Sequence, residues 1–423
     1  MSALVDAAYL LGLTAASPWW GWRLLRTGKH RTDWSARLGR GDSLRPTGPQ
    51  GRVLVHAVSV GEVNAARALV ERLAAEGDVV LSVTTDTGFA RAMQLFGQRV
   101  PVLRYPFDAG FAVERFLDRV RPTLVALMEL EVWPNFLRAC GDRGIPVGVV
   151  NGRLSERSFG RYRLARPVLS GMFGRLAFVA AQTQAYADRF AQMGVPVDRV
   201  SVSGTMKWDT AQVADTVSGS DELARELGID PERPLVVAGS TAPGEEAMLH
   251  AAVPEGVQLL CAPRKPEWFE GAARDLPACV RRSTRVRGDG ATRFLLDTIG
   301  ELRKAYALAT VVVVGRSFGT LHGSDMMEPV ALGKATLIGP RYGDFADMAQ
   351  ALIEAGALHV TSAYELGRDL ASLLHEPGRR AEMASAGRAV IAARQGATAR
   401  HAALIRAMMV RGASEASGRA AHA

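Results

Sequence analysis

Short, mostly apolar runs alternate with helical patterns over most of the 423 residues of this chain, and this alternation constrains the fold more than any other feature. Runs without an apolar–polar alternation indicate strands buried on both faces. The helical patterns between them indicate a parallel sheet covered on both sides. The first series comprises RVLVHAV, VVLSVTT, TLVALMEL, PVGVVNG and FVAAQT, and the second comprises PLVVAGS, VQLLCAP, RFLLDT, TVVVVG and ATLIGP.

Two such series predict an α/β chain with two doubly wound, Rossmann-like domains that face a central cleft. With 48% hydrophobic residues, the chain is long enough to fill two cores. The first domain is predicted over residues 46–205, a polar linker over 206–218, and the second domain, with the C-terminal helices, over 219–423. Ligands of such sheets bind at the carboxyl ends of the strands, so functional residues are expected there.

The first 45 residues form a segment of a different kind. The stretch ALVDAAYLLGLTAASPWWGWRLL is apolar but is interrupted by Asp6, Gly12 and Pro18, which disfavours a clean spanning helix. Aromatic and basic residues follow or end it: Trp19, Trp20, Trp22, Arg23, Arg26, Lys29, Arg31, Arg37 and Arg40. This pattern predicts a helix on or dipping into a membrane, with its arginines on anionic lipid. The alternative is a helix packed on the protein's own core.

Composition narrows the classes of ligand. The formal net charge of +8 suits an anionic partner such as a membrane, a nucleotide or a phosphorylated lipid. The three cysteines and eight histidines show no metal-ligand spacing, so neither a metal nor another cofactor is expected. Aromatic residues are not interleaved with a basic stripe, which argues against nucleic acid. The GRSFG motif around Ser317 is discounted as a nucleophile elbow, because TLHGSD intervenes before any helix.

One acid, Glu62, stands where the first predicted strand passes into a helix. It lies in SVGEV, where Gly61 is expected to permit a sharp turn and Ser59 precedes the helix. The carboxylate is therefore placed near a helix N-terminus at the carboxyl end of a strand. Two interpretations stay open: an acid that complements the helix dipole, or a general base directed at a substrate.

A second acidic position follows the strand in LMELEVWPN. Glu129 and Glu131 are two residues apart and would share one face of an extended segment. They either form a paired-carboxylate site or hold arginines from neighbouring loops, such as Arg153 in NGRLSERS. The second role is favoured for at least one of them, because adjacent like charges raise a pKa unless cations intervene.

Three loops of the second half end at corresponding strand ends. They are GSTAPGEE with Ser240 and Thr241, PRKPEW with Arg264 and Lys265, and the long loop GRSFGTLHGSDMMEP that contains Glu328. Small residues and helix N-termini favour a phosphate, and an arginine adds a bidentate donor. Glu328 is suited to accept from a ribose diol. The three loops together predict a nucleotide pocket.

Taken together, these motifs resemble the Kdo transferases, which attach 3-deoxy-D-manno-octulosonic acid (Kdo) to the lipid A precursor in lipopolysaccharide biosynthesis. The resemblance covers nearly the whole chain, and the motifs occur in the family's order. They include HAVSVGEVNAA, RPTLVALMELEVWPN, GIPVGVVNGRLSERS, VSGTMKWD, AGSTAPGEE and EPVALGKATLIGP. The resemblance implies a GT-B fold, CMP-Kdo as donor, lipid IVA as acceptor, an inverting and metal-independent reaction, and a place on the cytoplasmic face of the inner membrane.

The resemblance also implies residue roles. Glu62 takes the position of the general base, while Glu129, Glu131, Arg153 and Ser59 belong to the acceptor and sugar side of the first domain. The donor side comprises Arg264, Lys265, Ser240, Thr241, Glu328, Ser324, Asp325 and Lys207.

The chain departs from the family pattern in its donor loops. Lys265 stands where a histidine is usual, and Ser324 and Asp325 stand where histidine and asparagine are usual. Three alternatives therefore stay open: a GT-B transferase that uses another CMP-activated ulosonic acid, a sugar-nucleotide epimerase of the same architecture, and an inactive membrane-bound protein that binds nucleotide or lipid.

Overall fold

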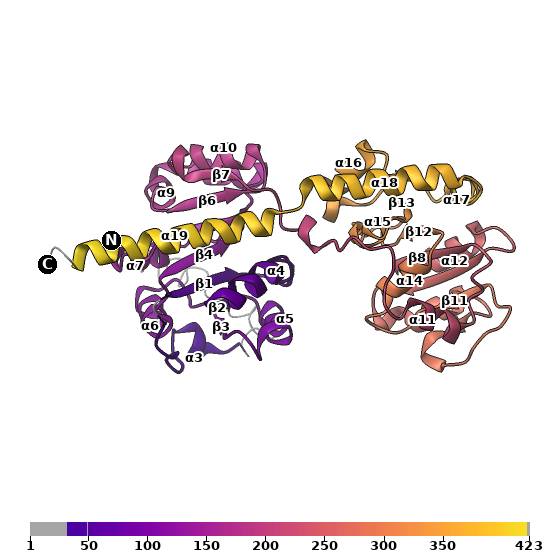
Figure 1. The fold of residues 1–423 in the computed structure, drawn as a ribbon, viewed down its shortest axis with the longest axis horizontal. Coiled ribbons are helices and arrows are strands. Elements are labelled where there is room, and N and C mark those ends of the chain that lie inside the picture. The colour runs from indigo at the N-terminus through magenta and orange to yellow at the C-terminus, as the bar shows by residue number, and fades with distance from the viewer. Residues whose placement is uncertain (1–31, 49, 421–423) are drawn as a thin grey trace, which may run out of the picture. The chain divides into compact units, whose positions relative to one another are not determined.

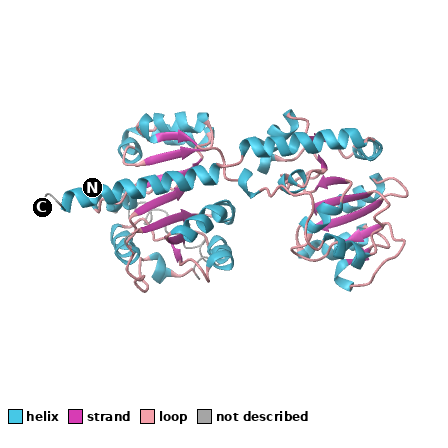
Figure 2. Ribbon diagram, viewed as in Figure 1, coloured by secondary structure: helices cyan, strands magenta, loops and turns pink. Residues whose placement is uncertain are grey.

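The computed structural model describes residues 32–48 and 50–420. Within these residues the chain divides into two compact units, one formed by the residues up to 210 together with those from 395 on, and the other by residues 211–394. Each unit is a parallel sheet flanked by helices (Figures 1 and 2). The predicted α/β class with two doubly wound domains is confirmed.

The first unit contains a seven-stranded parallel sheet of order β3-β2-β1-β4-β5-β6-β7. Its strands are β1 (Arg52–Ala57), β2 (Asp78–Val83), β3 (Val102–Arg104), β4 (Leu124–Met128), β5 (Val147–Gly152), β6 (Phe178–Ala181) and β7 (Val200–Val202). Its helices are α3 (Trp34–Arg37), α4 (Val60–Glu76), α5 (Asp86–Phe96), α6 (Gly110–Val120), α7 (Pro134–Asp142), α8 (Glu156–Leu164), α9 (Arg166–Phe173), α10 (Gln184–Gln192) and α19 (Ala397–Ala420), with 3₁₀ turns η2 (Val197–Arg199) and η3 (Trp208–Thr210).

The second unit contains another seven-stranded parallel sheet, of order β10-β11-β9-β8-β12-β13-β14. Its strands are β8 (Leu235–Thr241), β9 (Gln258–Pro263), β10 (Val280–Arg281), β11 (Arg293–Leu295), β12 (Val311–Val314), β13 (Ala335–Ile338) and β14 (Leu358–Val360). Its helices are α11 (Ser220–Leu227), α12 (Glu245–Ala252), α13 (Phe269–Asp275), α14 (Leu302–Leu308), α15 (Met327–Ala331), α16 (Ala346–Glu354), α17 (Leu366–His375) and α18 (Pro377–Arg394), with 3₁₀ turns η4 (Pro266–Trp268), η5 (Arg282–Thr284) and η6 (Gly343–Phe345).

The strand orders place the functional loops. In the first sheet the order in which strands are added changes side between β1 and β4, and in the second sheet it changes side between β8 and β12. Such topological switch points are where open α/β sheets bind ligands, at the carboxyl ends of the strands. Glu62 follows β1 and Glu129 follows β4, whereas Ser240 is the last residue but one of β8 and Arg316 follows β12. The sequence motifs therefore stand at the two switch points.

The ten strands predicted from apolar runs are all present, and four further strands were not predicted. These four are β3, β7, β10 and β14, each of two or three residues, and they form the outer edges of the two sheets. Edge strands have only one neighbour and are partly exposed, so they carry no long apolar run. Their residues are indeed mostly half-buried or exposed. Strand β7 lies before the linker predicted over 206–218, within the range predicted for the first domain.

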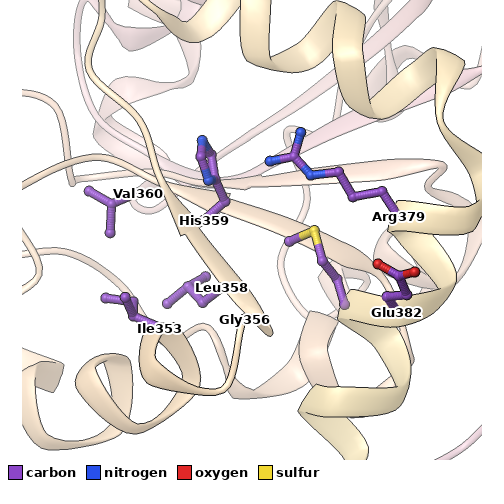
Figure 3. A pocket seen from close by; sticks show the side chains of 8 residues that line it. Ile353, Gly356, Leu358, His359, Val360, Arg379 and Glu382 are labelled. Atoms are coloured by element: carbon purple, nitrogen blue, oxygen red, sulfur yellow. The ribbon is translucent and has the colours of Figure 1, made fainter.

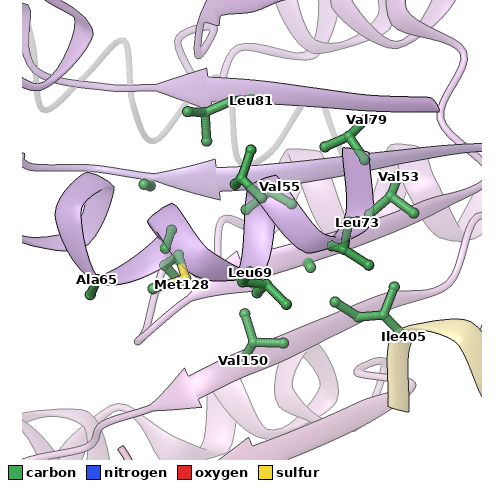
Figure 4. Packing of buried hydrophobic residues seen from close by; sticks show 14 of the residues in the cluster. Val53, Val55, Ala65, Leu69, Leu73, Val79, Leu81, Met128, Val150 and Ile405 are labelled. Atoms are coloured by element: carbon green, nitrogen blue, oxygen red, sulfur yellow. The ribbon is translucent and has the colours of Figure 1, made fainter. Parts of the chain in front are cut away.

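The last helix, α19, belongs to the first unit, whereas the sequence predicted a second domain that runs from residue 219 to residue 423. Helix α19 follows the crossing at residue 395, and Ile405 packs against Leu73 and Val150 in the first core (Figure 4). Ala397 and Ala402 are buried in the same cluster. Asp209 accepts hydrogen bonds from the N–H groups of Gly396 (2.6 Å) and Thr398 (2.5 Å) at the start of this helix. Burial of an apolar face explains why the chain returns.

Most of the predicted membrane-associated helix, residues 1–31, lies outside the described residues. Within residues 32–48 and 50–420, no helix combines the length and apolar character needed to cross a bilayer. Arg37, expected on lipid, is instead buried and donates hydrogen bonds to the carbonyl oxygens of Tyr105 (2.9 Å) and Thr84. A buried guanidinium needs such acceptors, so this part of the basic segment packs on the first unit.

Candidate active site

Glu62 is both a capping residue and a pocket residue. Its N–H donates to the hydroxyl of Ser59, the N-cap of α4, at 3.4 Å. In return, the Ser59 hydroxyl donates to Glu62 Oε1 (3.2 Å), and the N–H of Val58 donates to Glu62 Oε2 (2.9 Å). This is a capping box in which the N3 carboxylate reaches back over the strand end. The two interpretations of Glu62 are therefore compatible, since one carboxylate both caps the helix and faces the pocket.

The surroundings tune this carboxylate toward proton transfer. Burial, together with the nearby carboxylates Glu129 and Glu131, raises the pKa of Glu62 to about 7, against the hydrogen bonds from Val58 and Ser59, which lower it. A general base works best when its pKa lies near the operating pH. Perturbed carboxylates of this kind are common at functional sites.

Gly61 does not act as expected. It lies within the first turn of α4 and has no positive φ. A Cβ added there would meet only the Ser59 hydroxyl oxygen, at 3.8 Å. The turn therefore does not require glycine, and the absent side chain instead leaves open space beside Glu62. The tight approach lies nearby at Gly88 of α5, where a Cβ would meet the carbonyl carbon of Ser59 at 3.2 Å.

A cavity of about 320 Å³ in the first unit brings the predicted acids together. It is lined by Glu62, Glu129, Leu130, Glu131, Arg153, Ser155, Ser158, Arg161 and Tyr162. Glu129 has φ of 54°, so the segment after β4 is not extended as predicted, although both acids still line the cavity. Glu131 accepts from the indole N–H of Trp133 (3.0 Å), and burial raises the pKa of Glu131.

The helix after Arg153 supplies residues that the sequence argument missed. Helix α8 contains no buried residue, and Ser155 caps it by accepting from the N–H of Ser158 (3.3 Å). Arg161 and Tyr162 project from it into the lining of the cavity. A run of exposed arginines on one helix, in RSFGRYRL, is the signal that would have identified this element.

In the second unit, the loops after β8 and β9 are bonded to each other. The N–H of Arg264 donates to the carbonyl oxygen of Thr241 (3.0 Å). Thr241 is fully buried and its hydroxyl donates to Glu246, so its side chain is not available to a ligand. Arg264 is exposed, and its guanidinium has no ion pair within the described chain. Lys265 pairs with Glu267 (3.5 Å) and lies over the Trp268 ring, 5.0 Å from its centroid.

The loop after β12 reaches the loop after β8. The hydroxyl of Ser324, which is buried, donates to the carbonyl oxygen of Ser240 at 3.5 Å. Asp325 accepts from the N–H of Met327 (2.8 Å), which starts α15. Burial raises the pKa of Glu328 in that helix, and the adjacent Asp325 raises it further. The three predicted loops thus gather at one edge of the sheet.

Two adjacent residues at the end of β8, Gly239 and Ser240, show how closely the backbone is packed there. A Cβ on Gly239 would overlap the Tyr306 hydroxyl oxygen at 1.9 Å, so only glycine fits there. Ser240 has φ of 57°, a left-handed conformation that non-glycine residues rarely adopt. Strained backbone of this kind clusters at functional sites.

Lys207 belongs to a different unit from the other predicted donor residues. It belongs to the first unit, next to Met206, whose N–H donates to Asn151 Oδ1 at 3.1 Å. The other seven predicted donor residues belong to the second unit.

A second cavity, of about 490 Å³, lies at the β14 edge of the second unit (Figure 3). Ile353 of α16, Leu358, His359 and Val360 of β14, and Arg379 and Glu382 of α18 surround it. None of the residues predicted to act in the reaction lines this cavity. In the described residues, no group of three or more His, Cys, Asp or Glu side chains is arranged to hold a metal.

Comparison with solved structures defines the class. A glycosyltransferase from Rickettsia africae superposes with a TM-score of 0.56 at 11% identity, covering 85% of this chain and 98% of that one. Anabaena HepE in complex with UDP gives a TM-score of 0.53 at 14% identity, covering 86% and 100%. Neisseria meningitidis UDP-GlcNAc 2-epimerase gives 0.52 at 12% identity, covering 79% and 94%. These likenesses establish the fold: two Rossmann-like units of the GT-B type.

Sequence comparison then gives the family. The family model for 3-deoxy-D-manno-octulosonic-acid transferase matches residues 32–210. The transferase of that name from Bordetella pertussis is 35% identical over 419 residues, covering 93% of this chain and 96% of that protein. The one from Haemophilus influenzae is 31% identical over 373 residues, covering 83% and 86%. The chain belongs to the 3-deoxy-D-manno-octulosonic acid transferase family, and is a glycosyltransferase of lipopolysaccharide biosynthesis.

Proposed function

We propose that this enzyme transfers Kdo from CMP-Kdo to a hydroxyl group of the lipid A precursor lipid IVA, with inversion at the anomeric carbon and with Glu62 as general base. The observation that carries the proposal is the carboxylate of Glu62 in the 320 Å³ cavity, with a pKa raised to about 7. A carboxylate with this pKa is about half ionised at neutral pH, and its ionised form can accept a proton.

The reaction is a single displacement. The acceptor hydroxyl oxygen attacks the anomeric carbon of Kdo while its proton passes to Glu62. The bond from that carbon to the phosphate oxygen breaks, and CMP leaves with the electron pair as a phosphate monoester. Inversion requires one base on the acceptor side and no enzyme nucleophile. The environment of Ser317 supports the absence of an enzyme nucleophile. Its buried hydroxyl donates to the carbonyl oxygen of Val314 (2.6 Å) and accepts from the N–H of Gly339 (2.8 Å).

The donor is assigned to the second unit. The exposed guanidinium of Arg264 and the loops after β8 and β12 supply positive charge and backbone N–H groups for the phosphate of CMP. Glu328 accepts hydrogen bonds from the cytidine ribose, and Lys265, Ser324 and Asp325 border the same site. No step of the displacement requires a metal ion.

The acceptor is assigned to the first unit. Helix α8 presents three exposed arginines, Arg157, Arg161 and Arg163, which suit the phosphates of a phosphorylated glycolipid. Large apolar side chains are exposed beyond the ends of β1, β3 and β4: Val60 at the start of α4, Phe107 and Trp133 are 37%, 42% and 37% exposed. Exposed apolar and basic groups in one unit suit the surface of an anionic membrane. We place the enzyme at the cytoplasmic face of the inner membrane on this ground.

The test is a transfer assay followed by mass spectrometry of the lipid product. Purified enzyme is incubated with CMP-Kdo and a tetraacylated lipid A precursor, and a mass increment of one or more Kdo residues is expected. Glu62→Gln should abolish turnover while retaining CMP binding. Glu71→Gln, an exposed acid on the same helix, is the matched control and should retain activity.

Two results would change the assignment. No Kdo increment, together with transfer of another CMP-activated ulosonic acid, would redirect the donor, and the residues Ser324 and Asp325 in the donor loop give this outcome a specific origin. Retained turnover in Glu62→Gln would exclude Glu62 as the base.

A further inference from the structure

A buried carboxylate, Glu245, joins the two loops at the switch point of the second sheet. It is the first residue of α12 and is 5% exposed. Its Oε2 accepts from the N–H groups of Ala242 (2.9 Å) and Arg316 (2.7 Å). Its Oε1 accepts from the N–H groups of Ser317 (3.0 Å) and Phe318 (3.2 Å). One side chain therefore satisfies four backbone donors, one on the loop after β8 and three on the loop after β12.

The backbone of Arg316 is fixed by these bonds and by two others. Its φ is 58°, in the left-handed region, which a non-glycine residue occupies only when its surroundings hold it there. Its N–H is bonded to Glu245, and its carbonyl oxygen accepts from the N–H of Gly323 (2.9 Å). The next carbonyl, of Ser317, accepts from the N–H of Arg341 (3.0 Å). The direction in which the Arg316 side chain leaves the backbone is thus set by its neighbours.

The Arg316 guanidinium has no partner of its own. It is half-buried, and within the described part of the chain it makes no hydrogen bond and no ion pair. A partly desolvated guanidinium is unfavourable until an anion approaches it. The loop that carries it touches the loop of Ser240, because a Cβ on Gly315 would lie 2.7 Å from the Ser240 carbonyl oxygen. Arg316 is therefore a cation at the edge where an anionic ligand is expected.

We propose that Glu245 is a positioning residue that holds Arg316 in its left-handed conformation, and that Arg316 contacts the phosphate of the nucleotide donor. The inference rests on the proposed function, since it requires a phosphate-bearing donor at the carboxyl ends of β8 and β12. It adds Arg316 to the donor site as a second cation besides Arg264. It also adds Glu245, a carboxylate that acts only through the loop after β12.

The experiment measures binding of CMP and of cytidine to the full-length enzyme by calorimetry. Arg316→Ala should weaken CMP binding about 10- to 100-fold, the effect of one charge-assisted hydrogen-bonded contact, and should leave cytidine binding unchanged. Arg316→Lys should recover part of the loss. Arg274→Ala, at an exposed arginine of α13, is the matched control and should bind CMP as the wild type does.

Glu245→Gln tests the positioning role, because its amide NH₂ cannot accept the bonds that the carboxylate accepts. It should also weaken CMP binding, and the double variant with Arg316→Ala should bind within a factor of about 3 of Arg316→Ala alone. The donor KM of both variants should rise, while the KM for the lipid acceptor stays unchanged. A merely structural role would multiply the two losses and affect both substrates.

The outcomes are distinguishable. If the wild type binds CMP and Arg316→Ala binds it equally well, the inference is wrong while the proposed function stands. Multiplicative losses would overturn the positioning role of Glu245. If the wild type binds no CMP, both the donor assignment and this inference fall. Should Glu245→Gln not fold, Arg316→Ala with CMP and cytidine still decides whether the contact exists.

Discussion

At the scale of single residues, the site is controlled by what surrounds each carboxylate. Glu62 accepts hydrogen bonds from Val58 and Ser59, which lower its pKa. Its pKa is nevertheless raised to about 7, because burial and the charges of Glu129 and Glu131 oppose those hydrogen bonds. The same residue type at Glu245 has four backbone donors and serves a loop instead. Chemical role therefore follows from environment rather than from residue type.

The first prediction concerns the pH dependence of transfer. Glu62 acts as a base only when ionised, so kcat/KM should rise with pH and level off above about 7, the raised pKa of this carboxylate. Below that midpoint, the rate should fall about tenfold for each pH unit. The measurement is initial rate against pH under donor-limited conditions. A flat profile between pH 5 and 8 would contradict the assignment.

The second prediction concerns Ser59→Ala. The Ser59 hydroxyl stabilises the ionised form of Glu62, so its removal should raise the pKa of Glu62 further and move the rate midpoint to higher pH. Loss of the helix cap should also lower the free energy of unfolding by about 1 kcal/mol. Thr183→Ala removes the comparable cap of α10, and should lower stability without moving the midpoint. An unchanged midpoint in Ser59→Ala would show that this hydroxyl does not tune the base.

Sequence reasoning located Glu62, Glu129, Glu131 and Arg153, because each follows a strongly apolar strand. It missed Glu245 and Arg316, which are bonded across 71 positions of sequence. Such a contact depends on the neighbouring positions of β8 and β12 in the sheet, and no local pattern encodes it. It also gave Gly61 a backbone role, although a glycine can equally mark open space beside a site.

At the scale of elements, the first sheet contains a buried ion pair that ties two strands in register. Arg52 of β1 is 1% exposed and lies opposite Asp78 of β2 in the parallel ladder. Its guanidinium bonds the Asp78 carboxylate (2.8 Å) and the carbonyl oxygens of Val120 (2.6 Å) and Arg45 (2.8 Å). Such a pair is costly to break, because the remaining charge is left without its partner.

The third prediction follows from this pair. Arg52→Ala should lower the free energy of unfolding by about 3 to 5 kcal/mol, measured by urea denaturation. Arg67→Ala, which removes an exposed pair with Glu71 on α4, should change it by less than about 1 kcal/mol. Equal effects of the two substitutions would show that burial does not determine the contribution of the pair.

The central strands could be predicted from sequence, and the edges could not. A strand between two neighbours and two layers of helices is mostly apolar, as VVVV of β12 is. An edge strand such as β7, with residues VSV, is largely exposed and resembles a loop. The physical reason is the number of faces that each strand buries, and the strands that were not predicted are therefore those at the edges of the sheets.

At the scale of the whole molecule, the core of the first unit is completed by the last helix. Ile405 of α19 is fully buried among residues of β1, α4 and β5, whereas the sequence suggested that this helix belongs to the second domain. An amphipathic pattern predicts a helix but does not say which sheet it covers. This boundary could therefore be assigned only from the packing.

The fourth prediction separates the stabilities of the two units. Ile405→Ala should lower the stability of the first unit by about 2 to 5 kcal/mol and shift only its transition in calorimetry. Leu370→Ala, at a fully buried position of α17, should shift only the other transition. A shift of the same transition by both substitutions would show that the two units unfold together.

The return of the chain at Gln395 has a consequence for synthesis. A ribosome that has made 394 residues has synthesised every strand of both sheets, but not the helix that covers part of the earlier one. The second unit can therefore complete its fold first, whereas in the first unit Val150 and Leu73 still lack their contact with Ile405. Nascent chains stalled before Ala397 are expected to recruit chaperones to their amino-terminal half, and this recruitment should end once the final helix emerges.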